Sequence, residues 1–253
     1  MEKHRLNTEY FIDMSKPLGR KAYGSIGHLP NSRLGPGDHN VDEGMAVICT
    51  KKVRDEFDRV IIQEKLDGSC CAVARLNGLI VPLNRAGWPA VSAPWHHHRM
   101  FHNWVMENVD RFTWLEEGER VVGEWLALAH STRYKLWHEP FVPFDIMKSR
   151  KKLDRRVIFS EFCERIAATR LTTPFVISIG PPMLPEIALK FAQERNHHGA
   201  VDLIEGIVYR VERLGRVDFL SKFVRADKVD GKYFAETYGE DVWNWRPAAQ
   251  EII

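Results

Sequence analysis

Short runs of apolar residues alternate with turn-forming residues along the chain, which predicts many strands and few long helices. The runs at 46–50, 59–65, 119–128, 141–147 and 176–179 contain β-branched or aromatic residues and are bounded by glycine, proline or polar residues. Runs of this length and composition favour buried strands over helices. We therefore expect a strand at each of these positions.

Hairpins are expected in addition to these strands. The runs 70–76 and 79–84 flank Asn77-Gly78, the strongest short hairpin signal, because both of these residue types accept positive φ angles. A second hairpin is expected from 205–211 and 217–224, which surround a glycine turn. The strands of a hairpin are antiparallel, so these segments predict antiparallel sheets.

Helical spacing of apolar residues occurs in other segments. Residues 98–115 and 185–196 carry apolar side chains at intervals of three and four positions. Residues 159–167 show the same spacing, and either Asp154 or Ser160 is expected to cap that helix. The helices are interspersed among antiparallel strands without regular strand–helix–strand repeats, so the predicted fold class is α+β.

The whole chain, residues 1–253, is expected to form a single domain with irregular ends. Residues 1–45 are rich in glycine, proline and basic groups and predict a loop-rich N-terminal arm, while 226–253 predict a short C-terminal tail. The arm either contacts a phosphate or nucleic acid, or packs on the domain as a surface loop. Its candidates for nucleic-acid contact are Lys21, His28 and Arg33.

Charge and composition narrow the function classes. The formal net charge is only +2, from 36 basic and 34 acidic residues, so nucleic-acid binding must depend on a local patch. The four cysteines lack CxxC spacing and predict free thiols in a reducing compartment. We expect no signal peptide, because no apolar region follows the first five residues, and no apolar stretch reaches membrane-spanning length. We expect a cytoplasmic protein.

One lysine interrupts the apolar pattern. Lys65 ends the strand that contains Val60-Ile61-Ile62, and Asp67-Gly68 turns the chain directly after it. An ammonium group is costly to enclose unless an anion meets it, so this position is typical of a pocket for a charged ligand. A deprotonated lysine at such a position is also a nucleophile.

Lys65 belongs to the first of six motifs that follow one another along the chain. They are Lys65-Leu66-Asp67-Gly68, Asn84-Arg85-Ala86-Gly87, Gly123-Glu124, Phe144-Asp145, Glu205-Gly206-Ile207-Val208 and Ser221-Lys222-Phe223-Val224-Arg225. In these motifs and their order the chain resembles the covalent nucleotidyltransferase superfamily of ATP-dependent RNA ligases, DNA ligases and mRNA capping enzymes. It is most similar to the RNA ligases, because few residues follow Arg225, whereas DNA ligases and capping enzymes usually carry an OB-fold domain there.

The resemblance implies an ATP-grasp-like ligase adenylation (nucleotidyltransferase) domain, with antiparallel sheets flanked by helices and no C-terminal OB domain. It implies that Lys65 attacks the α-phosphate of ATP and carries AMP, and that burial and nearby cations lower the pKa of Lys65. AMP would pass to an RNA 5′-phosphate, and a 3′-hydroxyl would displace it to seal nicked or broken RNA. The implied cofactors are ATP and Mg²⁺ or Mn²⁺, and the implied partner is RNA.

The same resemblance implies a role for each site residue. The catalytic residues would be Lys65, Glu205 and Lys222. Glu205 would support the metal, and Lys222 would offset charge on the α-phosphate. Phe144 would stack on the base, Glu124 would hold a ribose hydroxyl, and Arg85 would bind ribose or nucleic-acid phosphate. The nucleotide-binding residues would be Glu64, Lys65, Arg85, Glu124, Phe144, Lys222 and Arg225.

The chain departs from the family pattern in two places. Cys70 stands where several such RNA ligases carry asparagine, and Lys222 is not followed two residues later by a second lysine. Arg225 either replaces that lysine or is a surface residue. A DNA ligase, a GTP-dependent guanylyltransferase and a non-catalytic nucleic-acid-binding relative are the alternative functions. Whether a protein partner supplies further nucleic-acid binding is also open.

Adjacent histidines occur at His96-His97-His98 and at His197-His198. No cysteine or carboxylate has ligand spacing to them, and neighbouring side chains on a strand or helix point in different directions, which disfavours a zinc site. The histidines instead predict a solvated loop or a contact with a phosphate near the substrate.

Overall fold

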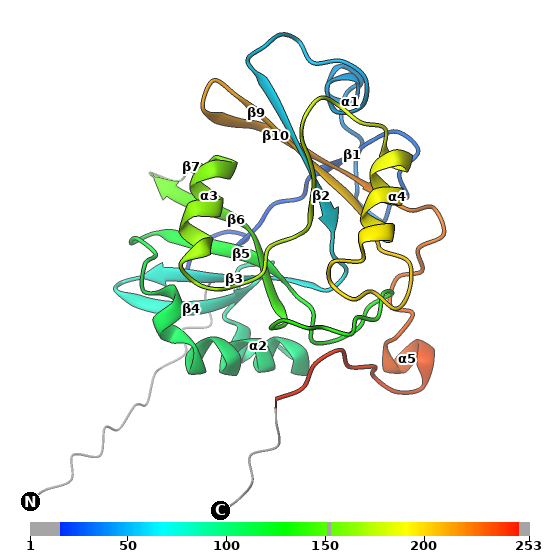
Figure 1. Cartoon of the computed structure of the whole chain (residues 1–253). Coiled ribbons are helices and arrows are strands. Elements are labelled where there is room, and N and C mark those ends of the chain that lie inside the picture. Colours follow the sequence, from blue (N-terminus) through cyan, green and yellow to red (C-terminus); the bar gives the residue numbers. More distant parts are fainter. Residues whose placement is uncertain (1–15, 151–152, 248–253) are drawn as a thin grey trace, which may run out of the picture.

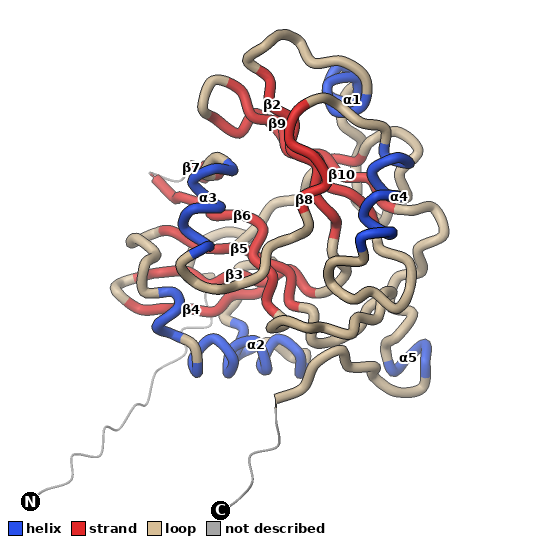
Figure 2. Tube along the Cα trace, viewed as in Figure 1, coloured by secondary structure: helices blue, strands red, loops and turns tan. Residues whose placement is uncertain are grey.

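The computed structural model describes residues 16–150 and 153–247 and contains two five-stranded sheets (Figures 1 and 2). The first sheet has the strand order β1-β10-β9-β2-β8, and the second has the order β4-β3-β5-β6-β7. Among these strands every pair is antiparallel except β1 with β10. Together with the helices between the strands, this arrangement confirms the predicted α+β class.

The strands are β1 (Gly27–His28), β2 (Asp58–Lys65), β3 (Ser69–Leu76), β4 (Leu79–Asn84), β5 (Glu119–Trp125), β6 (Phe141–Arg150), β7 (Leu153–Arg156), β8 (Val176–Gly180), β9 (Gly206–Arg213) and β10 (Arg216–Val224). The α-helices are α1 (Glu43–Thr50), α2 (His96–Glu107), α3 (Phe159–Ala167), α4 (Pro185–Arg195) and α5 (Ala235–Tyr238). Helix α2 packs on β3 and β4 of the second sheet, whereas α4 packs on β2, β8 and β9 of the first. A different helix therefore packs on each sheet.

Both predicted hairpins are confirmed. Asn77 and Gly78 join β3 to β4 with φ angles of 52° and 77°. Leu214 and Gly215 join β9 to β10 in the same way, with φ angles of 49° and 71°. Positive φ at both central positions gives the turn a twist that matches the strands on either side.

The strand predicted at 46–50 is wrong, because these residues belong to helix α1. The side chain of Asp42 accepts a hydrogen bond from the backbone N–H of Met45 at 2.8 Å and caps the helix. A short apolar run is compatible with a helix or a strand, and here the capping residue Asp42 in front of the run favours the helix.

Helices α2 and α3 also differ from what the sequence predicted. The segment 98–115 forms α2 followed by a separate 3₁₀ turn at Val109–Phe112, rather than one continuous helix. Neither Asp154 nor Ser160 caps α3. Instead, the carboxylate of Glu212 accepts a hydrogen bond from the N–H of Phe159 at 2.5 Å, a contact that joins β9 to the start of the helix.

The expected N-terminal arm, 1–45, is described from residue 16 onward and consists mostly of loop. It is attached to the first sheet through β1, whose residues pair with Ser221 and Lys222 on β10. Residues 1–15 of the expected arm and 248–253 of the expected tail lie outside the described residues.

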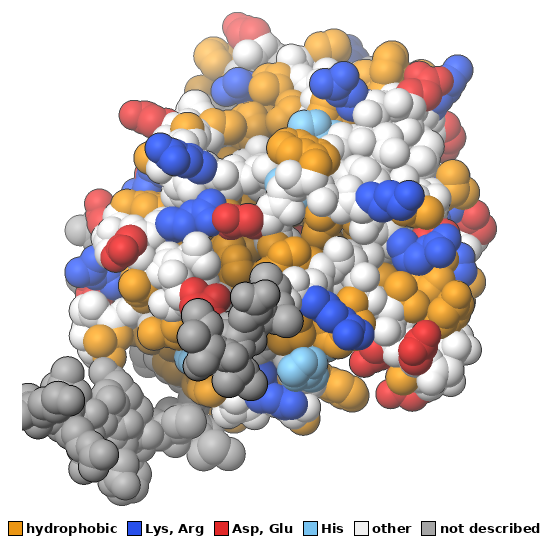
Figure 3. All heavy atoms as spheres, turned by 60° about the horizontal axis from the view of Figure 1, so that its bottom comes forward, with side chains coloured by type: hydrophobic (Ala, Val, Ile, Leu, Met, Phe, Trp, Pro, Cys, Tyr) orange, Lys and Arg blue, Asp and Glu red, His pale blue; other side chains and the backbone are white. Residues whose placement is uncertain are grey.

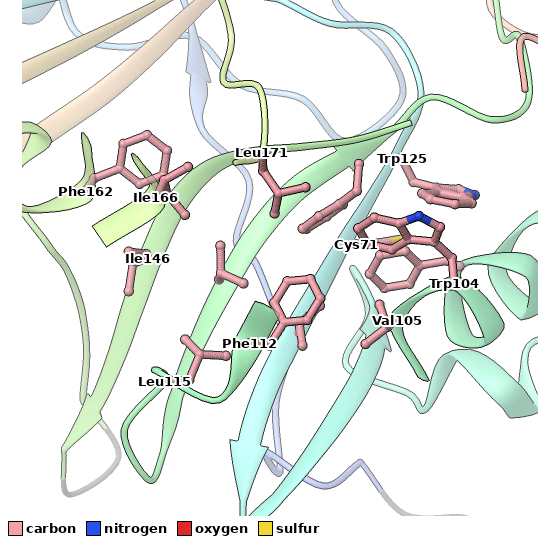
Figure 4. Packing of buried hydrophobic residues seen from close by; sticks show 14 of the residues in the cluster. Cys71, Trp104, Val105, Phe112, Leu115, Trp125, Ile146, Phe162, Ile166 and Leu171 are labelled. Carbon is pink, nitrogen blue, oxygen red and sulfur yellow. The ribbon is translucent and has the colours of Figure 1, made fainter. Parts of the chain in front are cut away.

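The largest core lies between the second sheet and helices α2 and α3 (Figure 4). Trp104 of α2 and Trp125 of β5 pack together in this core, with ring centroids 5.7 Å apart, and Phe101 meets Trp125 edge-on. Burying side chains of this size contributes roughly 1.5–3 kcal/mol each, which fixes α2 against the sheet.

The outer surface carries charges of both signs. Figure 3 shows lysine and arginine interspersed with aspartate and glutamate over one face, consistent with the net charge of +2. Within the described residues, every helix is too short or too polar to cross a membrane.

Asp145 is fully buried where the two sheets meet. Its Oδ2 accepts hydrogen bonds from Nε of Arg156 at 2.9 Å and from the Tyr23 hydroxyl at 3.0 Å. Its Oδ1 lies 3.3 Å from Nη1 of Arg210. Arg210 belongs to β9 in the first sheet, whereas Asp145 belongs to β6 in the second. Since a buried charge requires a partner, this ion pair joins the two sheets.

Asp145→Ala is expected to lower the free energy of unfolding by about 3 kcal/mol, because Arg210 and Arg156 would lose a buried partner. Asp227→Ala is the control. Asp227 pairs with Arg225 at the surface and is 67% exposed, so its loss is expected to cost less than about 1 kcal/mol. Urea denaturation followed by circular dichroism measures both values, and equal losses would contradict the bridging role of Asp145.

Candidate active site

A cavity of about 250 Å³ lies between the two sheets. Its walls include residues from β2, β9 and β10 of the first sheet and from β3, β5 and β6 of the second. Seven of the predicted site residues line it, namely Glu64, Lys65, Arg85, Glu124, Phe144, Glu205 and Lys222. Residues that are distant in the sequence therefore converge on one space.

Glu205 binds two lysines, one on each carboxylate oxygen. Its Oε2 accepts a hydrogen bond from Nζ of Lys65 at 2.6 Å, and its Oε1 accepts one from Nζ of Lys228 at 2.5 Å. Lys228 also pairs with Asp67 at 3.0 Å. Glu205 and Asp67 are almost completely buried, so solvent and salt screen these charges only weakly. The next residue is Gly206, where a Cβ atom would lie 2.0 Å from a carbonyl oxygen of β10 and does not fit.

The pKa of Lys65 changes in the direction opposite to the prediction. Burial lowers this pKa, but the carboxylates of Glu205 and Glu124 outweigh burial and raise it above the ordinary lysine value. Lys222 is the lysine with the lowered pKa, because it is buried and lies near the positive charge of Lys65. The prediction for Lys65 is wrong because the sequence does not show how closely the carboxylates approach it. In the ligand-free protein, Lys65 is an ammonium ion paired with Glu205.

Two carboxyl groups of the cavity have raised pKa values. Burial raises the pKa of Glu64 to about 8, and its Oε2 has no hydrogen-bond partner within the described residues. Burial also raises the pKa of Glu124 to about 7, against the opposing attraction of Lys65. A protonated carboxyl group both donates and accepts hydrogen bonds, so these side chains suit hydroxyl groups and the edge of a base.

Phe144 and Arg85 lie on the part of the cavity wall that the second sheet forms. The ring of Phe144 is half-buried and meets Tyr23 edge-on, with ring centroids 5.3 Å apart. A planar ring beside a cavity offers a surface on which a base can stack. Arg85 follows β4, is exposed, and donates a hydrogen bond from Nη2 to Oγ of Ser25 at 3.2 Å. An accessible guanidinium group suits phosphate oxygens.

Two predicted residues, Arg225 and His28, do not line the cavity. The guanidinium of Arg225 donates to a backbone carbonyl and pairs with Asp227, so Arg225 is not part of the cavity wall. His28 is buried, with its ring nitrogens 2.6 Å from Oγ of Ser32 and 3.0 Å from Asp38. Its imidazole holds the arm together rather than facing nucleic acid.

The other arm candidates, Lys21 and Arg33, are not part of the cavity wall either. Lys21 is exposed, and Arg33 pairs with Asp230 at 2.7 Å. Their contact with nucleic acid stays a prediction.

Lys228 and His130 also line the cavity, although neither belongs to one of the six sequence motifs. Lys228 lies just after β10, three residues beyond the end of the fifth motif. This position close to the motif was the only feature of the sequence that could have indicated Lys228. His130 follows β5 in a loop, and its Nε2 lies 3.1 Å from Oγ of Ser69. The neighbouring Ser131 donates two hydrogen bonds to Asp67, at 2.6 Å from its N–H and 2.7 Å from its hydroxyl. No sequence pattern marks this loop.

Glu64→Gln is expected to stabilise the ligand-free protein at alkaline pH. The unfolded carboxyl group loses its proton near pH 4.5, whereas the folded group keeps it to about pH 8. The folded state therefore binds more protons between these values. Wild-type stability should fall relative to the variant across this window, by up to about 1.4 kcal/mol per pH unit. Urea denaturation at a series of pH values measures the difference, and a difference independent of pH would contradict a buried, protonated Glu64.

A sequence model of the family described as RNA ligase matches residues 58–224, well over half of the chain. No curated protein matches the chain. Similar solved structures include an archaeal ATP-dependent RNA ligase, which is 15% identical and has a TM-score of 0.48, with 80% of this chain and 48% of that chain covered. They also include a mutant of the Naegleria gruberi RNA ligase with ATP and Mn, which is 14% identical and has a TM-score of 0.48, with 79% and 60% covered.

The chain therefore spans about half to three fifths of the length of these solved structures. The family match begins with β2 and ends with β10, and it includes Lys65, Glu205 and Lys222. The chain belongs to the RNA ligase family.

Proposed function

We propose that the protein is an ATP-dependent RNA ligase that carries AMP on Lys65. The observation behind this proposal is that Lys65, Glu205 and Lys222 line one cavity, with Nζ of Lys65 2.6 Å from Glu205. Membership of the RNA ligase family supports the same class of activity. A cavity with an aromatic ring, protonated carboxyl groups and several cations also has what the binding of a nucleotide requires.

In the first step, Nζ of Lys65 attacks the α-phosphorus of ATP. A phosphorus–nitrogen bond forms, the bond from the α-phosphorus to the bridging oxygen breaks, and pyrophosphate leaves with the electron pair. The ammonium group must first lose a proton, and the carboxylate of Glu205 is within hydrogen-bonding distance to accept it. Lys222 in the same wall would offset the negative charge that develops on the α-phosphate.

The remaining cavity residues would hold the nucleotide. Phe144 would stack on adenine, which gives affinity without selecting the base. Glu64 would bind the base edge through a carboxyl group that keeps its proton at neutral pH. Glu124, whose pKa is raised to about 7, would bind a ribose hydroxyl. Arg85 would bind a phosphate.

The described residues contain no group of three or more histidine, cysteine or acidic side chains arranged to hold a metal ion, so a divalent ion here would bind through one or two carboxylates, water and the triphosphate. Glu205 and Asp67 are buried carboxylates, and each pairs with a lysine ammonium group. Their negative charges therefore already attract cations in the ligand-free protein. Glu205 would hold Mg²⁺ or Mn²⁺, through water, because Mg²⁺ takes few carboxylates and keeps several waters. When bound, the ion supplies positive charge against the triphosphate.

Two further steps would complete sealing. An oxygen of the RNA 5′-phosphate attacks the phosphorus of the bound AMP, and the phosphorus–nitrogen bond breaks as Lys65 takes up a proton. The 3′-hydroxyl of the second end then attacks the 5′-phosphate, forms the phosphodiester and releases AMP. The carboxylates near Lys65 favour its return to the ammonium form.

Incubation with ATP labelled on the α-phosphate, together with Mg²⁺ or Mn²⁺, is expected to leave label on the denatured wild-type chain. Lys65→Ala is expected to remove the label, because the nucleophile is gone. Lys190→Ala replaces a lysine that is 78% exposed on α4 and is expected to keep full labelling.

Labelling by GTP instead of ATP would point to a guanylyltransferase. No label with either nucleotide, or label that persists in Lys65→Ala, would contradict the covalent intermediate. Assays on nicked RNA, nicked DNA and single-stranded RNA would then identify the substrate.

Lys228→Met is expected to raise the pKa of Lys65 further, because the positive charge of Lys228 is one of the influences that lower it. The Lys65 amine should then react with an acylating reagent at higher pH than in the wild type. Brief acylation of the metal-free protein across a pH series, followed by mass spectrometry, gives the midpoint. Lys228→Arg retains the charge and should keep the wild-type midpoint. An unchanged or lower midpoint in Lys228→Met would show that the two lysines are not coupled.

A further inference from the structure

A second cavity, the histidine hollow, adjoins the nucleotide cavity and has a volume of about 800 Å³. Cys70, Arg85 and His130 line both spaces, so the two cavities share a wall. The histidine hollow lies between the start of α2 and the C-terminal segment 230–243. Figure 1 shows this segment, in red, running from α5 back past α2. The nucleotide chemistry described above makes no use of this space.

Four histidines form one side of the hollow, namely His96, His97, His98 and His130. The rings of His97 and His98 have centroids 4.3 Å apart, and those of His97 and His130 are 6.2 Å apart. Burial and the neighbouring imidazoles lower the pKa of His97 to about 3 and that of His98 to about 4, so both rings are neutral. Nδ1 of His98 is buried and has no hydrogen-bond partner within the described residues.

These histidines have the features of an anion site rather than a metal site. Nowhere in residues 16–150 and 153–247 are three or more histidine, cysteine or acidic side chains arranged to hold a metal ion. Each neutral imidazole carries one N–H donor. Burial and crowding make a proton on His97 or His98 costly until a negative charge arrives, and Arg85 adds a positive charge on the same wall.

Aromatic residues form much of the remaining wall. Trp95, which precedes α2, is 58% exposed. Trp243 meets His96 edge-on at 5.7 Å, and Phe234 meets His130 edge-on at 4.8 Å. Exposed aromatic rings beside phosphate-binding groups are the usual means by which proteins bind unpaired nucleotides, because every base can stack on them.

The carboxylates of the hollow all belong to the C-terminal segment and are Asp230, Glu236 and Asp241. Asp230 pairs with Arg33 at 2.7 Å and with Lys228 at 3.3 Å. Asp241 accepts a hydrogen bond from the N–H of Ala235 at 3.0 Å. The negative charges therefore lie on the segment opposite α2, which leaves the side formed by the histidines and Arg85 suited to an anion.

We propose that the histidine hollow binds the 5′-phosphorylated terminal nucleotide of the RNA strand that receives AMP, with the phosphate against His97, His98 and Arg85 and the base against Trp95. This inference rests on the proposed function. A 3′-hydroxyl end carries no terminal dianion and would not need this group of donors. Arg85 lines both cavities, so a phosphate bound beside it lies next to the AMP that it attacks.

Direct binding provides a test that does not depend on catalysis. A short single-stranded oligoribonucleotide with a 3′ fluorophore is prepared with a 5′-phosphate or a 5′-hydroxyl, and its anisotropy is followed as metal-free protein is added. The wild type is expected to bind the 5′-phosphate form about tenfold more tightly. The His97→Gln/His98→Gln double variant should reduce this preference to about twofold or less. Trp95→Ala should weaken both forms alike, because it removes stacking and leaves the phosphate contacts.

His102→Gln is the matched control. His102 lies one turn further along α2, lines neither cavity and is half-buried like His97 and His98. It should keep the wild-type preference, and thermal unfolding monitored by circular dichroism should show that all variants fold. Equal wild-type binding of both oligonucleotides would overturn the proposal, as would an unchanged preference in the double variant. A 5′-hydroxyl oligonucleotide with a 3′-phosphate that binds as tightly as the 5′-phosphate form would also overturn it, because the hollow would then not select the 5′ end.

Measuring the two reaction steps separately distinguishes a failure of this proposal from a failure of the proposed function. The double variant should label Lys65 with AMP as the wild type does, while transfer of AMP to the 5′-phosphorylated strand falls about tenfold or more. Absence of label on the wild type would refute the proposed function and leave the binding test standing. Normal labelling with undiminished transfer in the double variant would refute the role of the hollow alone.

Discussion

A buried carboxylate forms an ion pair that joins the two sheets. Asp145 of the second sheet is fully buried and is neutralised by Arg210 from the first sheet and Arg156 from its own. Arg210 and the neighbouring Phe144 also line the nucleotide cavity, so the contact that joins the sheets forms part of the wall of the space between them. Loss of this charge would alter stability and cavity shape together.

A second set of ion pairs, between lysines and carboxylates, lies inside the cavity. Glu205 is shared by Lys65 and Lys228, and Asp67 is held by Lys228 and by the loop at Ser131. In the ligand-free state Lys65 is therefore a cation. Under the proposed function, a triphosphate with its metal ion would compete for the same charges, so nucleotide binding and release of the Lys65 proton would be linked in this site.

The sequence predicted which residues line the cavity better than it predicted their electrostatics. Lys65 and Glu205 were found because ordered motifs specify them, and Asn77-Gly78 fixed a hairpin through local backbone preference. Helix α1 was missed because a short apolar run fits either secondary structure. Lys228 and the direction of the Lys65 pKa shift were missed because both depend on distances between segments that only the folded chain brings together.

The matched family segment and the physical site have different boundaries. The match covers residues 58–224, but Lys228, Phe234 and Trp243 follow it, and Tyr23 precedes it. A fragment trimmed to the match would retain Lys65, yet it would lose Lys228, the second cation on Glu205, and the C-terminal wall of the histidine hollow. The residues that set the charge of Lys65 thus extend beyond the segment by which the family is recognised. A shortened chain made for crystallography or engineering should therefore keep the residues on both sides of that segment.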